Sequence, residues 1–160
     1  MTRLITATIA AMLLTPAMAC SQPQSEGSIP REANGYPVRV LTVKDGDTFE
    51  IDSRGWSPFP NLSWSVRVRG IDTPEKRSKC AAEKAAAMRA KDFTQALMRR
   101  YQNRVWLQAV AHDKYGGRFD AVVVFQNGQS LGDILIKAGL ARPYFAGKRQ
   151  PWCAFGVLRP

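Results

Sequence analysis

Acidic and basic side chains lie close together within residues 66–75, whose sequence is VRVRGIDTPE. Asp72 and Glu75 are three residues apart, and Arg67 and Arg69 precede them. Carboxylate oxygens are the ligands that hard divalent cations prefer, and guanidinium groups bind phosphate through parallel N–H donors. These residue types therefore suit a site that holds a divalent metal ion next to a phosphate.

A second pair of carboxylates flanks a glycine in the sequence Asp45-Gly46-Asp47-Thr48. Glycine lets the backbone turn without steric cost, and most such turns only face solvent. Together with Asp72 and Glu75, however, the turn offers four carboxylates, enough oxygen donors for Ca²⁺. A conventional zinc site is excluded, because the chain has three cysteines and one histidine.

A third group of residues, 113–118, joins two expected strands. It contains the cations Lys114 and Arg118, the aromatic Tyr115 and two glycines. This combination suits a phosphate that approaches the backbone closely, with Tyr115 available for base stacking or a hydrogen bond. Taken alone, it is more typical of an ordinary glycine-rich hairpin loop.

The elements that must position these residues follow from the hydrophobic pattern. Residues 66–71 alternate as a strand, with Val66, Val68 and Ile71 facing a core, and the strand is expected to stop at Thr73-Pro74 because proline disfavours continuation. Further strands are expected at residues 37–44, 48–51, 103–111 and 118–125. Helices are expected at residues 80–101, with Ser78 as N-cap, and at 131–138, ended by Gly139.

This order of elements predicts an α+β fold, mainly β. About five strands with an inserted long helix suit a five-stranded barrel of the OB type, with the long helix after the third strand and a short C-terminal helix. A generic α+β sheet fits the pattern nearly as well.

Composition indicates an anionic partner. The chain has 160 residues, of which 45% are hydrophobic, so one domain with a real core is expected. Lys and Arg number 23 against 13 acidic residues, a net charge of +10. Such an excess favours nucleic acid or an anionic membrane surface as partner.

The N-terminus predicts export. Residues 1–19 form a signal peptide with a short positive start, an apolar run and the cleavage site Ala17-Met18-Ala19. Residues 20–35 are polar and are expected to form a flexible arm, or a tether if Cys20 carries a lipid, although Ala17 stands where a lipoprotein signal usually has leucine. The folded domain is expected at residues 36–160, secreted or periplasmic, or else anchored to the membrane.

Cysteine usage predicts one disulfide. Only Cys80 and Cys153 remain beyond Cys20, and an exported protein meets an oxidising compartment. We therefore expect Cys80 and Cys153 to pair, which would tie the C-terminal tail to the start of the long helix.

Four motifs in order resemble the staphylococcal nuclease (thermonuclease) family. They are Asp45-Gly-Asp-Thr-Phe, Arg67 followed by Ile71-Asp-Thr-Pro-Glu75, Asp113-Lys-Tyr-Gly-x-Arg118, and Ala138-Gly-Leu-Ala141. The resemblance covers residues 38–144, and the ordered set is more specific than any single motif. It implies an OB barrel and a Ca²⁺-dependent, monomeric nuclease that hydrolyses phosphodiesters of DNA and RNA to 3′-phosphates.

The resemblance also implies metal-site roles. Asp47 and Asp72 would bind the metal through their side chains and Thr73 through its carbonyl, with Asp45 in support. Glu75 would orient or deprotonate the attacking water.

For the substrate, the resemblance implies that Arg67 and Arg118 grip the scissile phosphate. Lys114 and Tyr115 would hold the neighbouring phosphate. Tyr144 matches the family's tyrosine-bearing segment only loosely and would be at most a weak substrate contact.

The sequence departs from the family pattern by one extra glycine before Arg118. Ungapped alignment would place Gly117 at the arginine position, but Arg118 keeps the following strand in register, with Ala121 at a small-residue position. The rival interpretation is a non-catalytic OB module that binds nucleic acid. Retention of Asp47, Asp72, Arg67 and Glu75 favours the nuclease, because a pure binder does not need all four.

Overall fold

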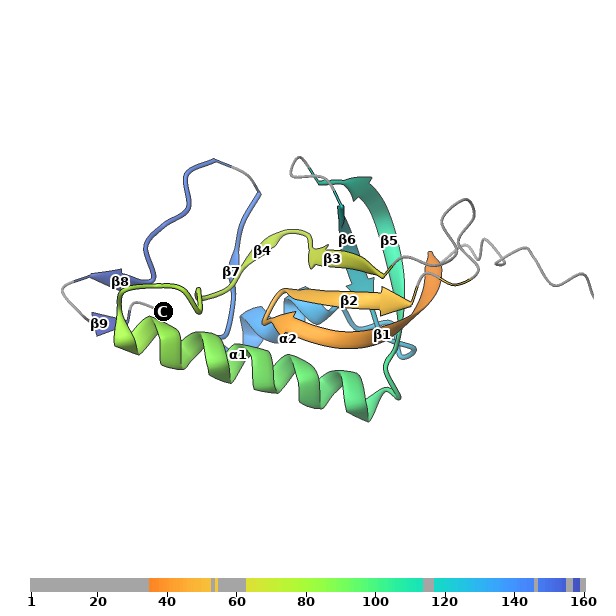
Figure 1. Cartoon of the computed structure of the whole chain (residues 1–160), viewed down its shortest axis with the longest axis horizontal. Coiled ribbons are helices and arrows are strands. Elements are labelled where there is room, and N and C mark those ends of the chain that lie inside the picture. Colours follow the sequence, from red (N-terminus) through yellow and green to blue (C-terminus); the bar gives the residue numbers. More distant parts are fainter. Residues whose placement is uncertain are drawn as a thin grey trace, which may run out of the picture.

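Five strands close into a mixed barrel in the order β1-β2-β3-β6-β5 (Figure 1). All neighbouring pairs are antiparallel except β3 and β6, which run parallel. The strands are β1 (Tyr36–Asp45), β2 (Thr48–Asp52), β3 (Trp64–Val68), β5 (Arg104–His112) and β6 (Arg118–Val124). The closed barrel confirms the predicted OB-type fold.

The computed structural model describes residues 35–52, 54, 63–113, 117–145, 147–154 and 157–158. The predicted signal peptide, the polar arm with Cys20, and the predicted substrate ligands Lys114 and Tyr115 lie outside the described residues. No helix in the described part of the chain is long and apolar enough to span a membrane.

The barrel interior is filled by alternating positions of the strands. Phe49, Ile51, Val66, Leu107 and Val123 are fully buried, and each such side chain stabilises the fold by about 1.5–3 kcal/mol. Register shifts interrupt β1 after Val40 and Val43 and β5 after Gln108. Irregularities of this kind bend and twist strands, which helps a short sheet to close.

The predicted strand at residues 66–71 is broken into two. β3 ends at Val68, and β4 (Ile71–Asp72) pairs instead with β7 (Arg142–Pro143). The break lies at Gly70, whose φ of +83° is a conformation that glycine adopts without strain. The change of direction carries Asp72 away from the barrel wall and into a small separate sheet.

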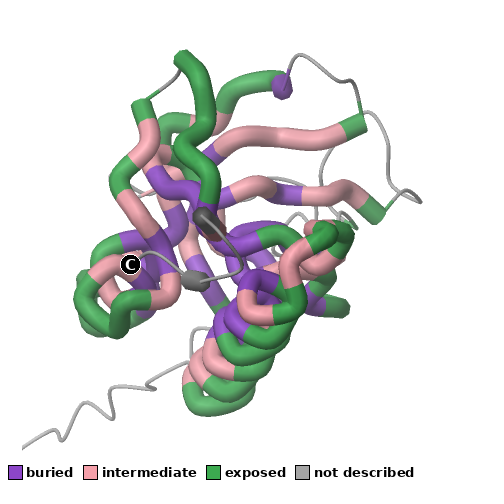
Figure 2. The backbone as a smooth tube through the Cα atoms, turned by 90° about the vertical axis from the view of Figure 1, so that its left-hand side faces the viewer, coloured by how far each residue is buried: buried purple, intermediate pink, exposed green. Residues whose placement is uncertain are grey.

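The long helix α1 (Ala81–Arg100) runs beneath β1 and β2 (Figure 1). Buried positions recur along one side of it (Figure 2), namely Ala86, Ala87, Ala90, Thr94 and Met98. Its N-cap is Cys80, so the prediction of Ser78 was wrong by two residues. The Ser78 hydroxyl instead accepts a hydrogen bond from the Cys80 N–H at 3.1 Å and donates to Glu83 Oε2 at 2.7 Å.

Helix α1 also fixes the turn between β1 and β2. The Thr94 hydroxyl donates to the Gly46 carbonyl at 2.7 Å. A Cβ atom at Gly46 would lie 2.8 Å from the Ala90 Cβ and 3.2 Å from the Thr73 Cγ2. Glycine is therefore required here by the close approach of helix, turn and the Thr73 segment.

The short helix α2 (Leu131–Lys137) packs Leu131 and Leu135 into the core. Its N-cap Ser130 accepts a hydrogen bond from the Asp133 N–H, and Gly139 follows with a φ of +68°. The predicted short C-terminal helix and its glycine stop are confirmed.

The C-terminal segment is tied to the start of α1 by the disulfide Cys80–Cys153, as predicted. β8 (Cys153–Ala154) pairs with β9 (Val157–Leu158). The disulfide joins residues 73 positions apart in sequence. It therefore holds residues just before Cys153 close to residues just before Cys80.

We predict that Gly46→Ala lowers the free energy of unfolding by about 1–3 kcal/mol, because the added methyl overpacks the contact with Ala90. Ala90→Gly alone should cost about 1 kcal/mol through helix propensity. The double variant should lose less than the sum of the two, since removing the Ala90 Cβ makes room. Urea unfolding of all four proteins measures this coupling, and strictly additive losses would contradict the proposed contact.

Candidate active site

Asp47 lies in the turn between β1 and β2 and is 4% exposed. Its Oδ1 accepts a hydrogen bond from the Thr48 hydroxyl at 2.9 Å. Burial raises the pKa of the Asp47 carboxyl, and the nearby Arg67 guanidinium opposes this by favouring the charged form. A buried carboxylate of this kind needs a cation close to it.

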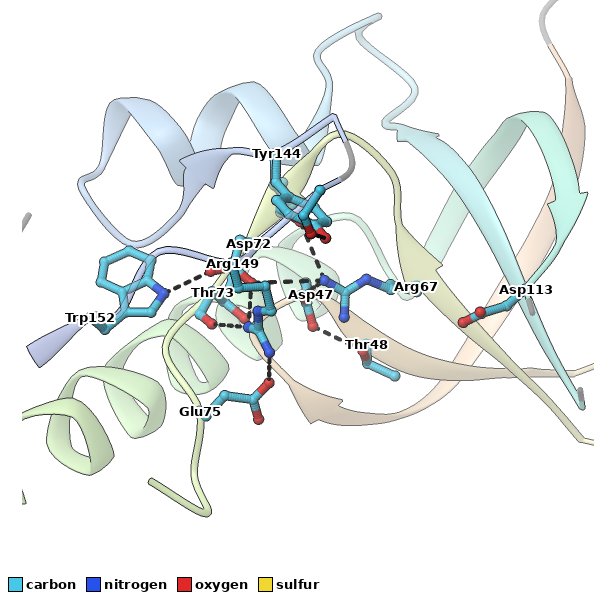
Figure 3. Close-up of polar contacts among 12 residues, drawn as sticks. Asp47, Thr48, Arg67, Asp72, Thr73, Glu75, Asp113, Tyr144, Arg149 and Trp152 are labelled. Carbon is cyan, nitrogen blue, oxygen red and sulfur yellow. Dashed lines mark hydrogen bonds and ion pairs between the residues drawn. The ribbon is translucent and has the colours of Figure 1, made fainter. Parts of the chain in front are cut away.

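Arg67 supplies one such cation from the neighbouring strand. It lies opposite Thr48 in the β2–β3 register, which places it beside the turn. Its Nη2 is 3.3 Å from Asp47 Oδ2 and 4.0 Å from Asp72 Oδ1, and it donates to the Ile71 carbonyl at 3.5 Å. One guanidinium thus lies between two buried carboxylates (Figure 3).

Asp72 sits on β4 and is also 4% exposed. Its Oδ2 accepts a hydrogen bond from the Trp152 indole N–H at 2.9 Å. Its Oδ1 forms an ion pair with Arg149. A buried anionic oxygen needs a cation beside it, and here a guanidinium of the chain fills that role.

Thr73 and Glu75 continue the chain toward α1. Thr73 is buried, and its carbonyl accepts a hydrogen bond from Arg149 Nη2 at 3.2 Å. The Glu75 side chain is half-exposed and forms an ion pair with Arg149 Nη1. The Glu75 N–H donates to Glu83 Oε1 at 3.1 Å, so α1 fixes this segment.

Arg149 also lies among these acidic residues, although the sequence motifs did not predict it as a site residue. Its guanidinium contacts Asp72, the Thr73 carbonyl and Glu75 at once (Figure 3). Burial lowers the pKa of Arg149, but its contacts with Glu75 and Asp72 outweigh this and raise the pKa above its ordinary value. Arg149 is therefore fully charged and acts as a counter-ion to the acidic residues.

The predicted disulfide could have shown from the sequence that Arg149 lies near the acidic residues. Arg149 precedes Cys153 by four residues, and Glu75 precedes Cys80 by five. Joining the two cysteines brings these flanking segments together. A basic residue in one segment and an acidic residue in the other then meet.

Trp152 anchors the same segment. It is 3% exposed and donates to Asp72, and the Arg142 guanidinium lies 3.8 Å from the centre of its ring. Arg142 in turn lies opposite Asp72 in the β4–β7 register. Aromatic packing and the indole N–H together fix the orientation of the Asp72 carboxylate.

Arg118 is engaged elsewhere in the structure. Its guanidinium forms an ion pair with Asp113 at the end of β5. Figure 3 places Asp113 on the far side of Arg67 from Asp72 and Glu75. Because β6 pairs with β3 and Arg118 lies opposite Ser65, two residues from Arg67, a shared grip of the two arginines on one phosphate stays a prediction.

Asp45 and Tyr144, which were also predicted as site residues, make contacts outside the group formed by Asp47, Arg67 and Asp72. Asp45 forms an ion pair with Lys76 at 2.9 Å and adds to the negative charge around Asp47. Tyr144 donates its N–H to the Gly70 carbonyl and its hydroxyl to the Gly147 carbonyl, each at 2.8 Å.

The oxygen atoms gathered here can be compared with the ligands that a divalent metal ion prefers. Asp47, Asp72 and the Thr73 carbonyl offer hard oxygens, and Asp72 Oδ1 already faces the cationic Arg149, which fits a cation such as Ca²⁺. Within the described residues, no three acidic, histidine or cysteine side chains gather as a metal-binding group. The fit therefore depends on a backbone carbonyl and on water completing the coordination.

Comparison with known proteins gives the family. A search of curated proteins finds no match. A family model described as staphylococcal nuclease homologue matches residues 65–152, which span β3 to the start of the disulfide-linked tail. Because this match covers more than half of the chain and the barrel has the expected form, the protein belongs to the staphylococcal nuclease homologue family.

Proposed function

We propose that the protein is a calcium-dependent nuclease that hydrolyses DNA, RNA or both to 3′-phosphate products. The family supports a nuclease-type function in general. The observation that carries the finer proposal is the convergence of five of the residues named from sequence: Asp47, Arg67, Asp72, Thr73 and Glu75. They provide oxygens for a metal, a guanidinium for phosphate and an accessible carboxylate within one cluster.

Asp47 and Asp72 would hold the calcium ion through their carboxylates, and Thr73 through its carbonyl. Bound there, the metal would neutralise charge on the phosphodiester and make its phosphorus more electrophilic. Trp152 would keep the Asp72 carboxylate oriented, because its indole N–H holds Oδ2 and turns Oδ1 toward the cation beside it, which is Arg149 in this structure.

Glu75 would act as general base. Its side chain is 49% exposed, so water can reach it. Attack of that water on phosphorus forms one P–O bond and breaks the bond to the 5′-oxygen, while Glu75 takes the water proton. The phosphate would stay on the 3′-oxygen, and the 5′-oxygen would take a proton from solvent water and leave as an alcohol.

Arg67 would stabilise the charge that develops on the phosphate oxygens. Its side chain is 20% exposed, so it can meet a substrate while still touching Asp47. Arg118 would leave Asp113 to grip the same phosphate, and Lys114 and Tyr115 would hold the next one. Asp45 would support the metal site through its negative charge.

The net charge of +10 supports a polyanionic substrate. The disulfide between Cys80 and Cys153 supports export, because such bonds persist in oxidising compartments. We propose a secreted or periplasmic monomer with a cleaved signal peptide, with lipid anchoring at Cys20 as the alternative.

One observation favours the second candidate, a non-catalytic OB module that binds nucleic acid. Arg149 neutralises Asp72 and Glu75, and Arg118 is paired with Asp113. A barrel whose acidic residues serve only internal ion pairs could bind a strand without cleaving it. Digestion of DNA and RNA distinguishes a nuclease from such a binding module.

The first test is digestion of single-stranded DNA and of RNA, with Ca²⁺ and with a chelator. Glu75→Gln should lower turnover by about 10²–10⁴-fold, since it removes the base but keeps the shape of the side chain. Glu50→Gln is the matched control, because Glu50 pairs with Lys44 away from the cluster. Folded protein that binds DNA without cleaving it in Ca²⁺ would establish the binding module instead.

The second test distinguishes the catalytic roles of Arg67 and Arg118. Arg67→Ala should lower kcat by about 10²–10³-fold, and it should also lower the free energy of unfolding, because the buried Asp47 carboxylate loses its guanidinium partner. If Arg118 also grips the phosphate, Arg118→Ala should lower kcat, whereas Asp113→Asn, which frees Arg118, should not. Equal activity of Arg118→Ala and the parent protein would limit Arg118 to its ion pair with Asp113.

A further inference from the structure

The contacts of Arg149 coincide with those that the proposed calcium ion requires. The guanidinium touches Asp72 and the Thr73 carbonyl, two of the three proposed metal ligands, and Glu75, the proposed base. Arg149 comes from the loop between β7 and β8, far from these residues in sequence. A cation carried by the chain thus occupies the place against Asp72 where a divalent cation would bind.

The charges around the cluster explain why such a cation is needed. Asp47, Asp72 and Glu75 carry three negative charges, and two of these carboxylates are buried. Arg67 contacts Asp47 and Asp72, whereas the contact with Glu75 is made by Arg149 (Figure 3). Arg149 supplies the second positive charge, which stabilises the cluster as long as no metal is bound.

The loop that carries Arg149 is fixed at both ends. At one end the Tyr144 N–H donates to Gly70, and at the other Trp152 is buried against Asp72 and Cys153 is joined to Cys80. Between these ends, Lys148, Arg149, Gln150 and Pro151 are exposed. The Arg149 side chain is 38% exposed, so it can turn away from Asp72 without disturbing the core.

We propose that Arg149 is a further active-site residue that exchanges places with the metal. In the metal-free protein it neutralises Asp72 and Glu75. When calcium binds, repulsion between the two cations moves the guanidinium off Asp72 and Thr73 and toward the substrate phosphate, where it serves as a further guanidinium in addition to Arg67 and Arg118. This inference rests on the proposed function, because it takes the same metal and the same phosphate.

Two opposite effects follow from this exchange. Removing Arg149 should strengthen calcium binding, because the metal no longer competes with a tethered cation. It should also slow turnover, because the phosphate loses a guanidinium that stabilises its developing charge. A merely structural role for Arg149 would weaken metal binding and catalysis together.

The experiment measures calcium affinity by calorimetry, and kcat on single-stranded DNA, for the purified protein with its disulfide intact. Arg149→Ala should bind calcium about tenfold more tightly and show a kcat lower by about 10²-fold. Lys148→Ala is the matched control, since it removes the same charge from the neighbouring exposed residue and should change neither value. Arg149→Lys, which keeps the charge but cannot bridge three acceptors, should fall between the two.

Unchanged or weaker calcium binding by folded Arg149→Ala would overturn the exchange. Unchanged kcat would overturn the contact with phosphate. If Arg149→Ala does not fold, Arg149→Lys decides, with tighter calcium binding expected and unchanged binding contradicting the proposal. If no protein cleaves DNA but Arg149→Ala still binds calcium more tightly, the nuclease function fails and the competition between Arg149 and the metal stands.

Discussion

The structure depends on two carboxylates, Asp47 and Asp72, that are buried next to each other and must be matched by cations. Each is 4% exposed, and an unpaired buried charge costs several kcal/mol. Arg67 lies between them, and Arg149 covers Asp72 from the other side. The protein thus keeps two buried carboxylates side by side, each matched by a guanidinium group, and these carboxylates are two of the ligands of the proposed metal site.

Three features of the chain bring these charges together. Gly46 lets the turn that carries Asp47 press against α1, and Gly70 redirects the chain so that Asp72 leaves the barrel wall. The disulfide draws the C-terminal segment back across α1, which places Arg149 and Trp152 on Asp72. The barrel thus contributes Arg67 and Asp47, whereas Asp72 and Arg149 come from segments that leave it.

Sequence patterns predicted the barrel strands well, because alternation of apolar side chains reports directly which face is buried, as at Val66 and Val68. They did not predict the break at Gly70, since a glycine's φ depends on where the following residues pair. They also missed Arg149, whose partners lie more than seventy residues away in sequence. Long-range ion pairs leave no periodic signal, so only the predicted disulfide pointed toward this contact.

The central claim is that Asp47, Asp72 and the Thr73 carbonyl form a calcium site from which Arg149 is displaced. A crystal structure of the protein with calcium and a non-hydrolysable single-stranded oligonucleotide tests it most directly. The account predicts calcium on these three ligands, with the Arg149 guanidinium moved from Asp72 to a phosphate oxygen. Calcium bound elsewhere, or Arg149 still on Asp72 with the oligonucleotide bound, would contradict it.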